Sequence, residues 1–197
     1  MISMQNNIGI LGGTFNPPHN GHIHLADIML DELRLDKLLI IPDFQPPHKG
    51  DVSVSAEDRL NMCRLAFDNP KIEVSDIEIK RGGKSYTIDT VTQLKAIYPE
   101  DNLFLIMSSD MLKIFNKWYR YKDILKLCTV CSSFRYDEPK ILPDFFEESD
   151  RVYLSSAEPL ILSSTQIREN IKNSIDVSGL IPKKVFEYIN EKGFYRD

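Results

Sequence analysis

Short apolar runs alternate with amphipathic stretches along the chain, and this alternation sets the first expectation. The apolar runs, each with the length of a β-strand, lie at residues 8–11, 37–41, 71–79, 103–107, 128–134 and 151–154. Between them, apolar side chains recur three or four residues apart, as they do in helices that bury one face. The pattern predicts an α/β protein with a parallel sheet and helices on its faces.

Capping residues, prolines and glycines mark the expected ends of the helices. These boundaries are Asn20 for the first helix, Ser55 with Asp58 and Asn69-Pro70 for the second, Thr87 and Tyr98 for the third, and Pro182 and Gly193 for the last. We expect the strand-like run 71–79 to break near Ser75-Asp76, with Ile77 and Ile79 continuing the alternation. Residues 138–150 are acidic and poorly periodic, which predicts a variable loop.

Composition limits the classes of protein that this chain can belong to. Its 197 residues, 42% hydrophobic and 27% charged, suit a single domain over 1–197 with a small C-terminal helical element at about 163–197. A net charge of -5 argues against nonspecific binding to DNA or RNA. No apolar run approaches the roughly 18 residues that span a bilayer, and the first residues lack signal-peptide character. We therefore expect a cytoplasmic protein without a nucleic-acid or membrane partner, and the sequence leaves a homo-oligomer open.

The three cysteines favour the same compartment. They are few and odd in number, as in proteins that keep their thiols reduced. Cys128 and Cys131 form a lone C-x-x-C, but positions three apart on a strand face opposite ways. We interpret both as core cysteines rather than as a zinc or redox pair.

The stretch from Gly12 to Leu25, GGTFNPPHNGHIHL, joins a strand to a helix through a tight turn. The start of a helix presents unpaired N–H groups and the positive end of the macrodipole, so it can bind an anion. Gly12 and Gly13 let the backbone approach a ligand closely. His19 and His22, three residues apart, share one side of the helix entrance. These features favour a polyphosphate site.

The sequence of this turn is also open to other interpretations. Its glycines fit neither the dinucleotide motif G-x-G-x-x-G nor the P-loop motif G-x-x-x-x-G-K-[ST]. A metal site built from His19, His22 and His24 is conceivable, but His24 should point away from His22 on a helix. A solvated loop with incidental histidines is the plainest alternative.

A second candidate phosphate site lies near the other end of the chain. Ser163-Ser164-Thr165 places hydroxyls at an expected helix start, where they can cap N–H groups or donate to phosphate. Arg168, one turn later, adds a planar set of donors that capping does not explain. His48 and Lys49 follow the second strand and point to the same edge of the sheet, although they also suit an exposed turn tip.

These motifs resemble a known family. GGTFNPPHNGH is similar to the first signature of the H-x-G-H nucleotidyltransferase superfamily, and of bacterial nicotinate-nucleotide adenylyltransferases in particular, and SSTQIR is similar to the S-S-T-x-I-R motif. The resemblance runs from about Ile8 to the C-terminus and implies a Rossmann-like, doubly wound parallel sheet. It also implies adenylyl transfer from ATP to nicotinic acid mononucleotide, giving nicotinic acid adenine dinucleotide and pyrophosphate in NAD biosynthesis.

The resemblance implies a role for each matching residue. The catalytic residues would be His19, His22, Lys49 and Arg168. ATP would be bound by Gly12, Gly13, Thr14, Phe15, His19, His22, Asp110, Ser164, Thr165 and Arg168. The pyridine mononucleotide would contact His48, Lys49, Thr87, Trp118 and Tyr119. Mg²⁺ would be held through the phosphates rather than by a protein site.

Some alternatives and departures qualify these roles. Thr87 also suits a helix cap, and Trp118 a core position, although its polar neighbours favour a partly exposed ring. The chain departs from the family pattern with Asn16 for Asp, Ser108 for Gly, and no R-P-G after its fifth strand. SYTIDT and KWY favour a pyridine carboxylate. The competing functions are transfer to nicotinamide mononucleotide or phosphopantetheine, and nucleotide binding without catalysis.

Overall fold

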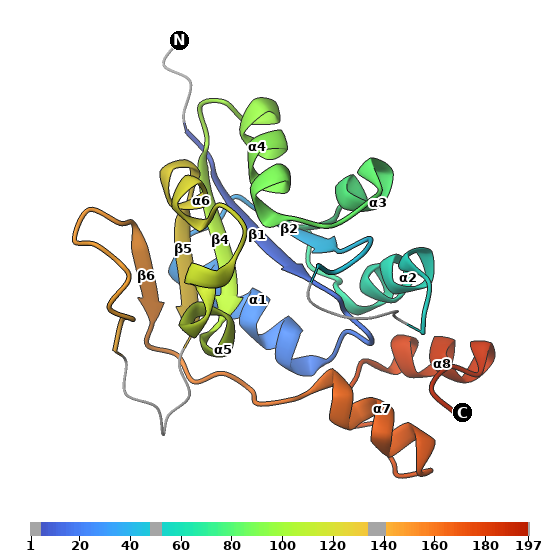
Figure 1. Ribbon diagram of the computed structural model, residues 1–197. Coiled ribbons are helices and arrows are strands. Elements are labelled where there is room, and N and C mark those ends of the chain that lie inside the picture. Colours follow the sequence, from blue (N-terminus) through green and yellow to red (C-terminus); the bar gives the residue numbers. More distant parts are fainter. Residues whose placement is uncertain (1–4, 48–52, 134–140, 197) are drawn as a thin grey trace.

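A parallel sheet forms the centre of the molecule (Figure 1). The computed structural model describes residues 5–47, 53–133 and 141–196. Its strands are β1 (Asn7–Gly13), β2 (Lys37–Pro42), β3 (Ile72–Val74), β4 (Asn102–Ser108), β5 (Thr129–Ser133) and β6 (Val152–Ser155). They are all parallel and lie in the order β3-β2-β1-β4-β5-β6. This is the order of a doubly wound, Rossmann-like fold, so the fold class expected from the sequence is confirmed.

Helices cover both faces of this sheet. They are α1 (Asn20–Glu32), α2 (Ala56–Ala66), α3 (Ile77–Arg81), α4 (Thr87–Ile97), α5 (Ser109–Lys113), α6 (Tyr121–Leu127), α7 (Ser164–Lys172) and α8 (Lys183–Lys192), with a 3-10 turn at Phe115–Lys117. Side chains of α1, α2, α7 and α8, such as Met29 and Ile189, belong to one apolar core. Side chains of α4 and α6, such as Val91 and Ile124, belong to the other. None of the helices in the described ranges is long and apolar enough to cross a membrane.

The chain changes its winding direction at β1. From β1 it proceeds outward to β2 and β3, and it then returns to β4, which pairs with the other side of β1. Open α/β folds bind ligands beyond the carboxyl ends of the strands at such a reversal. Gly13 ends β1 and Ser108 ends β4, so the turn after Gly13 and Asp110 in α5 flank this point.

One element was predicted with the wrong type. Residues 77–81, expected to continue a strand, form the short helix α3. Apolar side chains two apart in five residues fit a strand, but Lys80 pairs with Asp76 at 3.1 Å, an i,i+4 contact that a helix brings together. Gly82, with φ of 68°, then ends the helix in a conformation that favours glycine.

The acidic segment before β6 is only partly the loop that the sequence indicates. Its described residues, 141–150, form turns. Phe146, however, is buried and stacks on Phe115 with the ring centroids 5.9 Å apart. This aromatic contact packs the segment against the apolar core to which α6 also contributes. The segment therefore supplies a core residue that its acidic composition does not indicate.

The two cysteines of the C-x-x-C are core residues, as predicted. Cys128 and Cys131 are free and buried, and they belong to the two different apolar cores. Burial raises the pKa of the Cys128 thiol to about 12, so this thiol stays protonated at neutral pH. The two side chains therefore lie on opposite sides of the sheet and do not form a pair.

Candidate active site

A stacked pair of histidines opens α1. His19 holds the N-cap position, and its ring centroid lies 3.6 Å from that of His22 with an interplanar angle of 17°. The backbone N–H of His19 donates to Nδ1 of His22 at 3.2 Å, so a neutral His22 ring carries its proton on Nε2. The predicted placement of both imidazoles on one side of the turn is confirmed.

His24 does not join this pair. Its Nε2 lies 2.9 Å from the carbonyl oxygen of Glu158, and its side chain is exposed. Within the described part of the chain there is no group of three His, Cys, Asp or Glu side chains that could hold a metal ion. The arrangement therefore favours the anion-binding interpretation of the turn over the metal-binding one.

His19 is a buried imidazole. It is 5% exposed, and its Nδ1 has no hydrogen-bond partner among the described residues. Burial lowers the pKa of His19 from 6.5 to about 4, because a buried imidazole is desolvated and its charged form is disfavoured. At neutral pH the ring is uncharged, and a bound anion nearby would favour its protonation.

We expect acid to destabilise the protein through His19. Its pKa is 6.5 when exposed and about 4 in the folded chain, so between these values the unfolded chain binds a proton that the folded chain does not. Stability is therefore lost as the pH falls through this range, by about 2 kcal/mol between pH 7 and pH 5. Urea unfolding at both pH values measures the loss. A His19→Asn variant with an undiminished pH dependence would contradict the assignment.

The turn before the histidines is held in an unusual backbone conformation. Phe15 has φ of 48°, in the left-handed region, and its ring is 2% exposed. The ring contacts those of His22 and Phe67, at centroid distances of 5.0 and 6.1 Å. Only the main chain of Phe15 can therefore face a ligand. Gly12, by contrast, is exposed at the end of β1.

A buried arginine in α2, which no sequence signal predicted, braces this turn. The Arg59 side chain is 1% exposed and pairs with Asp43 at 2.9 Å. It also donates to the carbonyl oxygens of Thr14 at 2.8 Å, Phe44 at 3.1 Å and Val54 at 3.4 Å. Thr14 Oγ1 donates to the same Asp43 carboxylate at 2.8 Å. The Gly12–Leu25 stretch is thereby joined to the segments that follow β2 and precede α2.

The second motif, SSTQIR, reaches the same turn from the far end of the chain. Ser164 Oγ donates to the carbonyl oxygen of Pro17 at 2.9 Å, and Arg168 Nη1 donates to that of Asn16 at 2.8 Å. Arg168 Nη2 also lies 3.3 Å from Thr165 Oγ1. A guanidinium has five N–H donors, so these contacts leave donors available for an anion. The two phosphate-binding candidates thus meet at one place.

The residues predicted to contact the pyridine ring come from two elements on the other side of the sheet. Thr87 is the first helical residue of α4; the cap position belongs to Tyr86, so the predicted capping role is wrong. The ring of Tyr86 lies 5.0 Å from that of Tyr119, which is 57% exposed. Trp118 is half-buried against Phe115, at 5.3 Å between centroids. Thr87 and Tyr119 are thereby brought into one neighbourhood.

The segment after β2 lies against the start of α4. The N–H of Ser85 donates to the carbonyl oxygen of Gln45 at 2.9 Å, and Ser85 Oγ accepts from the N–H of Phe44 at 2.9 Å. These bonds bring the chain leading to His48 and Lys49 beside the Thr87 region. His48 and Lys49 themselves lie outside the described residues.

A family model agrees with the two motifs. The cytidylyltransferase-like family model matches residues 10–170 of the chain. A probable nicotinate-nucleotide adenylyltransferase of Dehalococcoides mccartyi (strain CBDB1) is 40% identical over 99% of this chain and 98% of its own length. The chain therefore belongs to the cytidylyltransferase-like family, as a relative of its nicotinate-nucleotide adenylyltransferases. The relative of the same name from Fusobacterium nucleatum is 41% identical over 94% of this chain and 97% of its own length.

Solved structures of nicotinic acid mononucleotide adenylyltransferase from Plasmodium falciparum share the fold of this family member. The complex with NaAD superposes with a TM-score of 0.80, at 18% identity, over 97% of this chain and 98% of the other. The complex with APC gives a TM-score of 0.78 over the same shares of the two chains. At this low identity the likeness concerns the fold.

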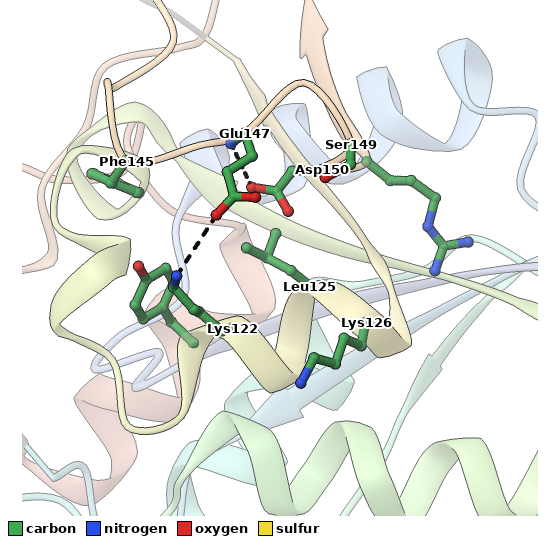
Figure 2. A pocket seen from close by; sticks show the side chains of 9 residues that line it. Lys122, Leu125, Lys126, Phe145, Glu147, Ser149 and Asp150 are labelled. Atoms are coloured by element: carbon green, nitrogen blue, oxygen red, sulfur yellow. Dashed lines mark hydrogen bonds and ion pairs between the residues drawn. The ribbon is translucent and has the colours of Figure 1, made fainter.

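A separate pocket of about 410 Å³ lies between α6 and the segment before β6 (Figure 2). Lys122 on α6 and Glu147 on the segment point toward each other and form an ion pair at 3.7 Å. Phe145, Asp150 and Arg151 also line it. None of the residues predicted to bind nucleotides lines this pocket. The pocket is distinct from the histidine turn, the Gly12–Leu25 stretch that carries His19 and His22. Its exposed ion pair is typical of a solvated surface.

Proposed function

We propose that this protein transfers the adenylyl group of ATP to nicotinic acid mononucleotide. The products are nicotinic acid adenine dinucleotide and pyrophosphate, in NAD biosynthesis. Relatives that align with almost the whole chain carry the name of this activity. One observation carries the proposal in a member of this family. Arg168 binds the turn that carries the stacked His19–His22 pair, beyond the carboxyl end of β1.

The reaction requires positioning more than covalent chemistry. An oxygen of the mononucleotide phosphate attacks the α-phosphorus of ATP, and the bond from that phosphorus to the bridging oxygen of the β-phosphate breaks. Pyrophosphate leaves with the electron pair, so no enzyme-bound intermediate is needed. The protein accelerates such a step by aligning the two phosphates and stabilising the negative charge of the transition state.

The phosphates would be held from both ends of the chain. His22, whose proton lies on Nε2 in the neutral ring, donates to the reacting phosphoryl group, and the buried His19 supports it. Gly12, Gly13, Thr14 and Phe15 offer main-chain atoms, and the start of α1 adds its dipole. Ser164, Thr165 and Arg168 would bind the departing pyrophosphate, with Lys49 assisting. Asp110 would accept hydrogen bonds from the ribose hydroxyls of ATP.

A divalent metal would enter with ATP, and we propose Mg²⁺. The side chains at the turn are imidazoles, hydroxyls and a guanidinium, which suit phosphate oxygens rather than a hard cation. The described residues also lack a cluster of metal-binding side chains. Such an ion would therefore coordinate the phosphate oxygens of the nucleotide and neutralise part of their charge.

Replacing the ring-contacting residues should weaken the pyridine nucleotide selectively. Thr87→Ala removes the hydroxyl at the start of α4, and Trp118→Ala removes the surface on which a flat heterocycle would stack. We expect each variant to raise KM for nicotinic acid mononucleotide by about 10-fold, with KM for ATP changed much less. Steady-state kinetics with one substrate varied at a time measures both values. Equal increases in both KM values would contradict separate binding of the two substrates by different residues.

The substrate itself is tested by pyrophosphate release from ATP. Nicotinic acid mononucleotide, nicotinamide mononucleotide and phosphopantetheine are supplied in parallel to the same preparation. We expect release with the first at the highest kcat/KM, because α4 starts with Thr87 and the start of a helix suits a carboxylate. A higher kcat/KM for either of the others would replace the proposed substrate. Nucleotide binding without release from any of them would indicate a non-catalytic protein.

A further inference from the structure

The C-terminal part of the chain contacts the histidine turn at Asn16, Pro17 and Asn20. Besides the bonds from Ser164 and Arg168, the N–H of Asn20 donates to the carbonyl oxygen of Leu180 at 2.9 Å. Asn20 Nδ2 donates to the carbonyl oxygen of Gly179 at 3.0 Å. Figure 1 shows α7 and α8 beside the start of α1. The turn that carries His19 is therefore held by residues more than 140 positions away, as in the contact of Ser164 with Pro17, 147 residues apart.

Tyr195, near the end of the chain, adds a side-chain contact to this set. Gly193 ends α8 with φ of 67°, and Tyr195 follows with φ of 65°. This left-handed conformation is uncommon for a tyrosine and turns the chain back toward the sheet. The Tyr195 hydroxyl donates to the side-chain oxygen of Asn16, which is 8% exposed. Burial raises the pKa of Tyr195, so its hydroxyl keeps its proton and remains a donor.

We propose that Tyr195 is a positioning residue, which acts through its hydrogen bond to Asn16 to set the turn that carries His19 and His22. Asn16 directly follows the strained Phe15 and lies three residues before His19. A hydrogen bond from another part of the chain to the Asn16 side chain can therefore fix the position of the turn. Arg168 binds the carbonyl oxygen of the same residue at 2.8 Å. The inference rests on the proposed function, because the turn is where the phosphates would be bound.

The neutral side chain of Asn16 also affects the charge at the turn. Among the described residues, no carboxylate lies within ion-pair distance of Arg168, so its charge is available to a phosphate. A carboxylate at position 16 would still accept the Tyr195 hydrogen bond. It would also place a negative charge beside Arg168 and beside the phosphates. Asn16 therefore accepts the hydrogen bond without adding a negative charge that would repel a bound anion.

The hydroxyl of Tyr195 is tested with Tyr195→Phe, and Tyr188→Phe is the matched control. Tyr188 lies on α8 and donates its hydroxyl to Asp58 at 2.8 Å rather than to the turn. We expect Tyr195→Phe to lower kcat by about 10-fold with KM for ATP nearly unchanged, because the turn is displaced rather than removed. Tyr188→Phe should keep kcat. Equal kcat values for the two variants, or a loss of thermal stability alone, would overturn the proposal.

Variants of Asn16 separate position from charge. Asn16→Ala should lower kcat as Tyr195→Phe does, and the double variant should be no worse than either single one, because both remove the same hydrogen bond. Asn16→Asp should keep kcat within about twofold but raise KM for ATP by about fivefold. A double variant whose loss of kcat equals the product of the two single losses would overturn the proposal. An Asn16→Asp variant with the kcat of Asn16→Ala would overturn it as well.

The imidazole signals give a readout that does not depend on activity. The chain has 4 histidines, so their ring resonances can be assigned by NMR from single variants. Tyr195→Phe should move the His19 and His22 signals and leave that of the exposed His24, which bonds to Glu158, whereas Tyr188→Phe should move none of the three. Unmoved His19 and His22 signals would overturn the proposal. A wild-type protein that releases no pyrophosphate would instead count against the proposed function and leave this test intact.

Discussion

Replacement of His22 by alanine should lower turnover by at least about 100-fold, which is the usual cost of removing a group that stabilises a charged transition state. The Nδ1 atom of His22 accepts from the N–H of His19, so the neutral ring carries its proton on Nε2, and this N–H is the donor that we propose for the phosphates. The His22 ring packs against the rings of Phe15 and His19, at centroid distances of 5.0 and 3.6 Å. Single-turnover rates with saturating ATP and mononucleotide measure the effect.

His24→Ala is the matched control for that experiment. His24 lies on the same helix, is exposed and points away from the turn. It should keep turnover within about twofold of the wild-type value. Both variants should retain the helical content of the native chain, since neither ring fills a core position. Near-normal turnover of His22→Ala would remove His22 from the catalytic residues.

Replacement of Arg59 by methionine should have the largest effect on stability. Removing one partner of a buried ion pair leaves an uncompensated charge, here on Asp43, and costs about 3–5 kcal/mol of unfolding free energy. The variant also removes the donor from three carbonyl oxygens that join Thr14 to the segments after β2 and before α2. Urea unfolding at neutral pH measures the loss.

An exposed arginine on the same helix provides the comparison. Arg64 is half-exposed and lies 3.9 Å from Glu57, so Arg64→Met should change stability by less than about 0.5 kcal/mol. Arg59→Lys keeps the charge but not the fork of donors, and it should fall between the two. A loss for Arg59→Met no greater than that for Arg64→Met would mean that the buried pair does not brace the turn.

The regular parts of the fold were predictable because each long element has a sequence signal that the structure obeys. The helix that starts after Ser55 shows this: its hydroxyl accepts from the N–H of Asp58, as the pair indicated. The prediction for the short segment Ile77–Arg81 was wrong because five residues contain too few periods of either hydrophobic pattern to distinguish a strand from a helix. Phe146 was missed because its neighbours are acidic, whereas its ring stacks on Phe115 from another element.

The candidate site was predictable where the signal is local and unpredictable where it is long-range. The spacing of His19 and His22 alone predicts that they share one side of a turn, and the structure confirms it. The pairing of Arg59 with Asp43 follows from tertiary packing, and a lone arginine on a helix normally indicates an exposed face. The same limit applies to Tyr195, which follows the last helix and donates its hydroxyl to Asn16, far away in the sequence.

The dependence of the first motif on the last residues has a consequence for synthesis of the chain. Residues near Asn16 leave the ribosome early, whereas Arg168 and Tyr195 follow 152 and 179 residues later, and N-terminal parts generally fold first. A nascent chain that has already paired all strands of the sheet still lacks the groups that fix its histidine turn. A chain that stops before Arg168 would therefore leave the turn unfixed, and we expect the nucleotide binding proposed for it to arise only after all strands of the sheet have been made.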